Sequence, residues 1–136
     1  MAKHKIFAAV MFMALIVLFI SCTVENTGTD TDAKDNIFVL VKYKSQPGKH
    51  NEALAALNSL ILDVKNEPNF VNIKLFADPS DETNILLYEQ WSDEEYYKGE
   101  HMSTPHLQKF MGDAREFLAG PPDISFWKLN NDYTSD

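Results

Sequence analysis

The sequence predicts an α+β domain whose strands and helices follow one another in the order β-α-β-β-α-β. Three observations carry this prediction: segments in which apolar residues alternate, segments in which they recur every three or four residues, and turn-forming residues between the two kinds of segment. A chain with this order forms an antiparallel sheet with its helices on one face. That is the ferredoxin-like arrangement.

The first half of the domain contains one predicted strand and one predicted helix. The strand is expected over residues 37–43, where β-branched and aromatic residues alternate, and Gln46-Pro47-Gly48 ends it in a turn. The helix is expected over residues 50–65, and it stops there because Pro68 disfavours helical backbone angles at Glu67. The residues expected on its buried side are Leu54, Leu57, Ile61 and Val64.

The second half is expected to contain strands at 70–76 and 84–91, helices at 93–100 and within 104–118, and a last strand at about 124–129. The turn Asp78-Pro79-Ser80-Asp81 joins the two strands into a hairpin. Ser92 and Glu95 have the spacing of a capping box, which predicts the start of the first of these helices. Three residues of the first strand in this half, Val71, Ile73 and Leu75, are expected to face one way, and the candidate buried residues of the second helix are Leu107, Phe110, Met111 and Phe117.

Apolar residues on the predicted strands exceed what one helical layer is expected to cover. The set in question is Val39, Val41, Leu87 and Trp91. A sheet with two apolar faces needs a second cover, which is either a pocket or a partner. We therefore expect a homodimer joined through the face that carries part of this set.

The first 22 residues form a predicted secretory signal. Lys3 and Lys5 precede an uncharged apolar run from Ile6 to Ile20, and Ser21 comes directly before Cys22, the only cysteine. The segment resembles a bacterial lipoprotein signal, which implies that Cys22 is lipidated and anchors the protein to a membrane of the cell envelope, facing outside the cytoplasm. An uncleaved membrane anchor with an incidental cysteine is the alternative.

Removal of residues 1–21 leaves ten basic and twenty acidic residues, a formal charge of −10. Nucleic acid is therefore not an expected partner, because its phosphates require basic surface. With Cys22 lipidated, no thiol remains for a disulfide or for a cysteine-ligated metal. Residues 22–35 are expected to be a polar tether, residues 36–129 the folded domain, and residues 130–136 a polar tail.

Two motifs within the domain point to a family. Residues 86–95 contain Tyr88-Glu89-Gln90-Trp91 at the end of a predicted strand, and residues 101–107 contain His101-Met102-Ser103-Thr104-Pro105-His106. Together they resemble the antibiotic biosynthesis monooxygenase family, and in particular its quinol-monooxygenase-like branch. The resemblance covers about residues 36–129 and implies a dimeric α+β barrel.

The resemblance implies oxidation of a quinol or other dihydroxylated aromatic by molecular oxygen, with no metal, flavin or haem. Such chemistry needs a base, a dry apolar pocket and groups that stabilise an anion. His101 or His106 is the candidate base, because imidazole titrates near neutral pH. Trp91 and Tyr97 are candidate walls of the pocket, and Glu89 shares the Trp91 face of the strand, where it is placed to orient a histidine or accept a substrate hydroxyl.

Each candidate also has a purely structural interpretation. Trp91 also suits packing in the core or at a dimer interface, and Glu89 suits pairing across that interface. His101 suits a helix C-terminus, where a cation is favoured, and His106 suits the turn after Pro105. Tyr97 competes with Tyr96 for the inward position. The five-residue spacing of the two histidines does not place both on one helix face, so no metal site is predicted.

Three functions remain open from the sequence. Cofactor-independent monooxygenation is the first, a non-catalytic ligand-binding or interaction module is the second, and a small-molecule isomerase is the third. The resemblance implies that haem-degrading relatives carry an iron-ligating histidine on the second helix, and the corresponding residues 110–113 contain no histidine, which disfavours haem degradation. Isomerisation of phosphorylated sugars, found in other relatives, is disfavoured because Arg115 is the only arginine. An ionisable residue in an enclosed pocket beside Trp91 distinguishes an enzyme from a binding module.

Overall fold

The computed structural model describes residues 35–135, so the predicted signal, most of the predicted tether and Cys22 lie outside the described residues. The described elements are β1 (Ile37–Lys44), α2 (His50–Val64), β2 (Phe70–Ala77), β3 (Asn84–Trp91), α3 (Glu94–Lys98), the 3-10 turn η1 (His101–Ser103), α4 (Pro105–Asp113), the 3-10 turn η2 (Ala114–Glu116) and β4 (Asp123–Lys128). Within residues 35–135, no helix has both the length and the apolar character to cross a membrane.

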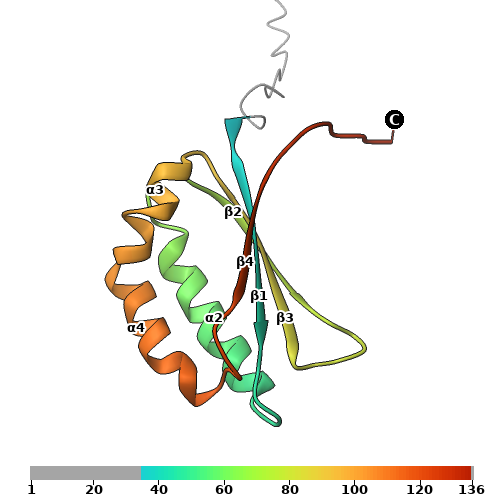
Figure 1. Cartoon of the computed structure of the whole chain (residues 1–136), viewed down its shortest axis with the longest axis vertical. Helices are drawn as coiled ribbons and strands as arrows, with labels where there is room; N and C mark the ends of the chain where they lie inside the picture. Colours follow the sequence, from blue (N-terminus) through green and yellow to red (C-terminus); the bar gives the residue numbers. More distant parts are fainter. Residues whose placement is uncertain (1–34, 136) are drawn as a thin grey trace, which may run out of the picture.

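The strands form one antiparallel sheet in the order β2-β3-β1-β4, and the helices cover one of its faces (Figure 1). The register between β1 and β3 pairs Ile37 with Trp91 and Val41 with Leu87. Because side chains opposite each other in a sheet share a face, Ile37, Val41, Leu87 and Trp91 lie on one face, which is the face that the helices cover. The predicted ferredoxin-like α+β fold is confirmed.

One helical layer covers the apolar residues of the central strands. Val39, Val41, Leu87 and Trp91 are each no more than 2% exposed, and all four lie on the helix-covered face. The layer that buries them is made by Ala53, Leu57, Leu60 and Val64 of α2 with Leu107 and Phe110 of α4. The prediction that part of this set forms a dimer contact is therefore wrong, because the helical layer of the same chain, with Tyr97 and His101 over Trp91, already covers it.

The opposite face of the sheet has no helix over it (Figure 1). Its apolar side chains include Phe38, Leu40, Leu86, Tyr88 and Trp127, and the Phe38 and Tyr88 rings lie 5.7 Å apart. Trp127 is 58% exposed. A second copy of the chain that packs its own sheet on this face removes the exposed apolar surface from water.

We expect residues 36–136 to sediment as a homodimer joined through this open face. A charge introduced by Leu40→Glu is expected to produce a monomer, since it buries a carboxylate in an apolar contact. The matched control is Leu62→Glu, which changes an exposed leucine of α2 on the other side of the molecule. A stable wild-type monomer at micromolar concentration contradicts the expectation, as does a Leu40→Glu variant that remains dimeric.

Local details depart from the predictions at three places, in β2, at the start of α3 and in α4. A β-bulge between Phe70 and Asn72 shifts the register of β2, so Phe70 packs on Trp91 while Val71 is 41% exposed and does not share the face of Ile73 and Leu75. At the start of α3 the N-cap is Asp93, whose side chain accepts a hydrogen bond from the Tyr96 amide at 2.9 Å. The predicted capping box is therefore wrong.

Contacts with a neighbouring loop explain why Ser92 does not cap α3. Its hydroxyl and its amide both bond to Asn69, and they tie the end of β3 to the loop before β2. The helix predicted within 104–118 is present as α4 and is followed by the 3-10 turn η2, but Met111 is 42% exposed instead of buried.

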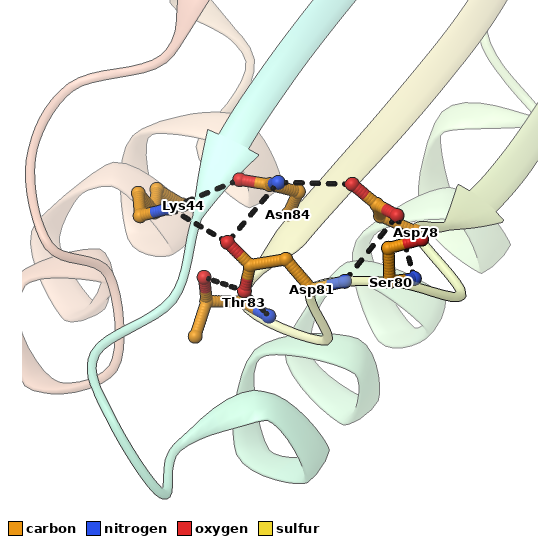
Figure 2. Close-up of polar contacts among 6 residues, drawn as sticks. All are labelled: Lys44, Asp78, Ser80, Asp81, Thr83 and Asn84. Atoms are coloured by element: carbon orange, nitrogen blue, oxygen red, sulfur yellow. Dashed lines mark hydrogen bonds and ion pairs between the residues drawn. The ribbon is translucent and has the colours of Figure 1, made fainter.

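The predicted turn between β2 and β3 is confirmed, and polar contacts close it (Figure 2). The Asp78 side chain accepts from the Ser80 amide at 2.8 Å, and Asp81 accepts from the amide and hydroxyl of Thr83 and from Lys44. These hydrogen bonds, led by that of the Thr83 hydroxyl, lower the pKa of Asp81 to about 2. Both aspartates thus stabilise the turn, because their carboxylates accept hydrogen bonds from groups within or beside it.

Candidate active site

A cavity of about 580 Å³ lies between the sheet and the helices. Its wall is mostly apolar, and the residues that form it come from every element around it: Val41, Tyr43, Gln46, Leu60, Ile61, Val64, Ile73, Leu87, Glu89, Tyr97, His101, Met102, Leu107, Phe110, Met111, Ala114, Arg115, Leu118, Ala119, Gly120, Pro121, Pro122 and Ile124. A volume of this size is typical of a site for a small organic molecule. Arg115 reaches it from η2, and Glu89, Tyr97 and His101 reach it from β3, α3 and η1.

Aromatic rings surround the point where β3 ends. The His101 ring centroid lies 4.6 Å from that of Trp91, and Tyr97 stacks on His101 at 4.8 Å with 25° between the ring planes. Tyr97 also meets Trp91 edge-on at 5.4 Å. The rings come together because β3, α3 and η1 follow closely in the chain. Their mutual packing then restricts the orientation of each ring.

Glu89 is a buried carboxyl group in the wall of the cavity. Its side chain accepts a hydrogen bond from the Trp91 indole nitrogen at 3.0 Å, and the residue is 5% exposed. Burial raises the pKa of Glu89 to about 7; the Trp91 hydrogen bond opposes this rise, and the nearby charge of Glu67 adds to it. The group is therefore able to hold or release a proton near neutral pH.

His101 is the second ionisable group that faces the cavity. It is 4% exposed, and its Nδ1 atom lies 2.8 Å from Oε2 of Glu67. Burial lowers the pKa of His101, the charge of Glu67 opposes that change, and His106 adds to it by repulsion. At neutral pH the imidazole is therefore uncharged, which is the state a general base requires.

Glu67 connects these groups from the loop between α2 and β2. Its side chain is 6% exposed and contacts His101 through Oε2 and His106 through Oε1, and it accepts a hydrogen bond from the Tyr96 hydroxyl at 3.1 Å. Burial, followed by this hydrogen bond, raises the pKa of Tyr96 to about 12. One carboxylate thus holds side chains from α3, η1 and α4 together.

The structure divides the five site residues predicted from the sequence into two groups. Glu89, Tyr97 and His101 line the cavity, whereas Trp91 packs behind His101 and Tyr97, and His106 lies on the far side of Glu67. His101 lies in the 3-10 turn η1, shortly after the C-terminus of α3. The two tyrosines do not compete for one inward position, because Tyr96 contacts Glu67 and Tyr97 is buried.

Sequence reasoning missed Glu67 and Tyr96. Glu67 lies 34 positions before His101 and 39 positions before His106. In the sequence, its segment predicts only the end of a helix. No spacing rule connects residues so far apart. Among residues 35–135, no group of three histidine, cysteine, aspartate or glutamate side chains is arranged to hold a metal ion.

Comparisons with known proteins identify two related sequences. Over 89 residues the chain is 32% identical to the Bacillus subtilis protein named "Putative monooxygenase YcnE", covering 65% of this chain and 93% of that protein. It is also 26% identical over 97 residues to the uncharacterized protein sll1783 of Synechocystis, covering 71% of this chain. The matched segment spans 65% of the length of that relative.

Solved structures share the fold at low sequence identity. A conserved protein from Methanosarcina mazei Go1 superposes with a TM-score of 0.66 at 19% identity, covering 72% of this chain and 96% of that one. Rv0793 from Mycobacterium tuberculosis superposes with a TM-score of 0.64 at 15% identity, covering 73% and 99%. A family model described as antibiotic biosynthesis monooxygenase matches residues 36–113, more than half of the chain. The chain therefore belongs to the antibiotic biosynthesis monooxygenase family.

Proposed function

We propose that the protein is a cofactor-independent monooxygenase that oxidises a quinol or another dihydroxylated aromatic with molecular oxygen. The observation that carries the proposal is the apolar cavity beside Trp91. Its wall contains the uncharged imidazole of His101 and the carboxyl group of Glu89, whose pKa is raised. Membership of the family and the name of the Bacillus subtilis relative support the same reaction class.

The reaction begins when His101 removes a phenolic proton from the substrate. The resulting anion transfers one electron to oxygen, and the two radicals combine to form a carbon–oxygen bond and a hydroperoxide. The O–O bond then breaks, and the leaving oxygen departs as water with protons from the substrate, one of them returned by His101. For hydroquinone itself, one hydroquinone and one O₂ give one hydroxyquinone and one water.

Residues of the cavity wall serve separate steps of this reaction. The apolar side chains exclude water, so a radical pair is not quenched by proton exchange with solvent. The pKa of Tyr97 is raised by burial and by Glu89, so Tyr97 keeps its proton and forms an uncharged aromatic wall beside the substrate. Glu89 accepts a hydrogen bond from a second hydroxyl of the substrate when it is ionised. When it is protonated, it donates a hydrogen bond to the quinone oxygen.

Oxygen consumption by residues 36–136 over a panel of hydroquinones, with a metal chelator present, tests the proposal. We expect turnover that the chelator does not reduce, with one atom of ¹⁸O₂ in the product and the other in water. Peroxide as the reduced product contradicts monooxygenation, and activity that the chelator abolishes contradicts independence from a metal.

A non-catalytic binding module is the second candidate, since the same cavity suits an aromatic ligand without any reaction. Saturable binding of the same hydroquinones with no oxygen consumption favours this alternative. The lipid anchor at Cys22 and a location in the cell envelope remain proposals from the sequence.

A further inference from the structure

The Glu67 carboxylate is the most highly connected polar group of the site, yet it does not line the cavity. It sits in the loop after α2 and receives side chains from three later elements. A carboxylate that is 6% exposed is costly to bury unless several donors compensate it. Three donors do so here, which means that the loop and the three elements hold a common geometry.

The two carboxylate oxygens are used differently. Oε2 contacts Nδ1 of His101 at 2.8 Å and accepts a hydrogen bond from the Tyr96 hydroxyl at 3.1 Å. Oε1 contacts Nε2 of His106. An ionised carboxylate only accepts hydrogen bonds, so the His101 nitrogen that faces it carries a proton. In an uncharged imidazole the other nitrogen, Nε2, then has the free lone pair.

We propose that Glu67 is a positioning residue that holds His101 as the Nδ1–H tautomer and turns its basic Nε2 toward the cavity. The proposal rests on His101 being the base of the proposed reaction. Glu67 has a second effect on that step, because its negative charge stabilises the imidazolium that forms when His101 takes the substrate proton.

Three neighbouring groups fix Glu67 itself. Tyr96 and His106 hold the carboxylate from α3 and α4, so it cannot rotate away from His101 without breaking both contacts. The Glu67 amide also donates to the Val64 carbonyl at 2.9 Å, which anchors the loop to the end of α2. The titratable groups around His101 on all packed elements are Glu67, Glu89, Tyr96, Tyr97 and His106.

The tautomer is measurable without turnover, by ¹⁵N chemical shifts of the imidazole nitrogens in the wild-type protein. We expect His101 to show a protonated Nδ1 and an unprotonated Nε2 at neutral pH. A His101 with the proton on Nε2 overturns the proposal. Since this result does not depend on any substrate, it separates a failure of the positioning role from a failure of the proposed reaction.

The variant Glu67→Gln removes the charge and keeps the size of the side chain. We expect the His101 pKa to fall further, the pH profile of turnover to shift, and kcat to drop on the order of 10²-fold with a smaller change in KM, as for a misplaced catalytic group. Glu67→Asp keeps the charge and is expected to recover part of the loss. Tyr96→Phe removes one donor to the same oxygen and is expected to cost much less.

The overturning results are equally specific. An unchanged tautomer and an unchanged His101 titration in a folded Glu67→Gln protein show that the carboxylate does not control the imidazole. A Glu67→Asp protein that is as impaired as Glu67→Gln, with both still folded, shows that charge is not what His101 needs. If Glu67→Gln does not fold, the wild-type spectrum and Glu67→Asp decide the question.

Discussion

Replacing His101 with glutamine is expected to lower turnover by about 10²- to 10⁴-fold while the protein stays folded. His101 is the histidine that lines the cavity, and its Nδ1 atom contacts Glu67, so the proposed tautomer leaves Nε2 free to accept a substrate proton. Glutamine fills a similar volume but has no basic nitrogen. Steady-state oxygen consumption at saturating hydroquinone measures the effect on kcat, and sedimentation and thermal unfolding check the fold.

Two other histidines supply graded controls for this experiment. His106→Gln is expected to have a much smaller effect, because His106 lies outside the cavity wall and acts only through Glu67. His50→Gln, at the start of α2, is expected to leave turnover unchanged. The assignment of the base is wrong if His101→Gln turns over at the wild-type rate, or if His106→Gln is the more damaged of the two.

The second large effect is a dependence of stability on pH that Glu89 causes. Its pKa is raised from 4.5 to about 7, so the folded protein binds a proton that the unfolded chain has already released between these values. Stability therefore falls as pH rises through this window and stops falling above about pH 7. One pKa unit corresponds to about 1.4 kcal/mol, which makes the loss on the order of 3 kcal/mol.

Glu89→Gln isolates this contribution, because glutamine keeps the shape and does not ionise. We expect the free energy of unfolding of the wild type to decline by about 3 kcal/mol relative to Glu89→Gln between pH 4 and pH 8, measured by urea unfolding at a series of pH values. The control Glu116→Gln changes an exposed carboxylate and is expected to follow the wild-type curve. Parallel curves for wild type and Glu89→Gln refute the raised pKa.

Local patterns in the sequence were sufficient to predict the order of the elements and the hairpin turn. Alternation over residues 37–43 and 84–91 predicts strands because side chains of a strand point to opposite faces in turn. The candidate site was predicted in part for the same reason. Glu89, Trp91, Tyr97 and His101 are close in sequence, so a strand that leads into a short helix brings them together without any long-range information.

The sequence by itself determined which residues share a face, and the tertiary structure decided which face the helices cover. Alternation is identical for both choices, whereas the packing of the helices on Val39, Val41 and Trp91 selects one of them. Tertiary structure also decided the bulge at Val71 and the place of Glu67. The loop that carries Glu67 reaches His101 only after the sheet and helices have packed, and contacts between residues so far apart in the chain leave no periodic signal in the sequence.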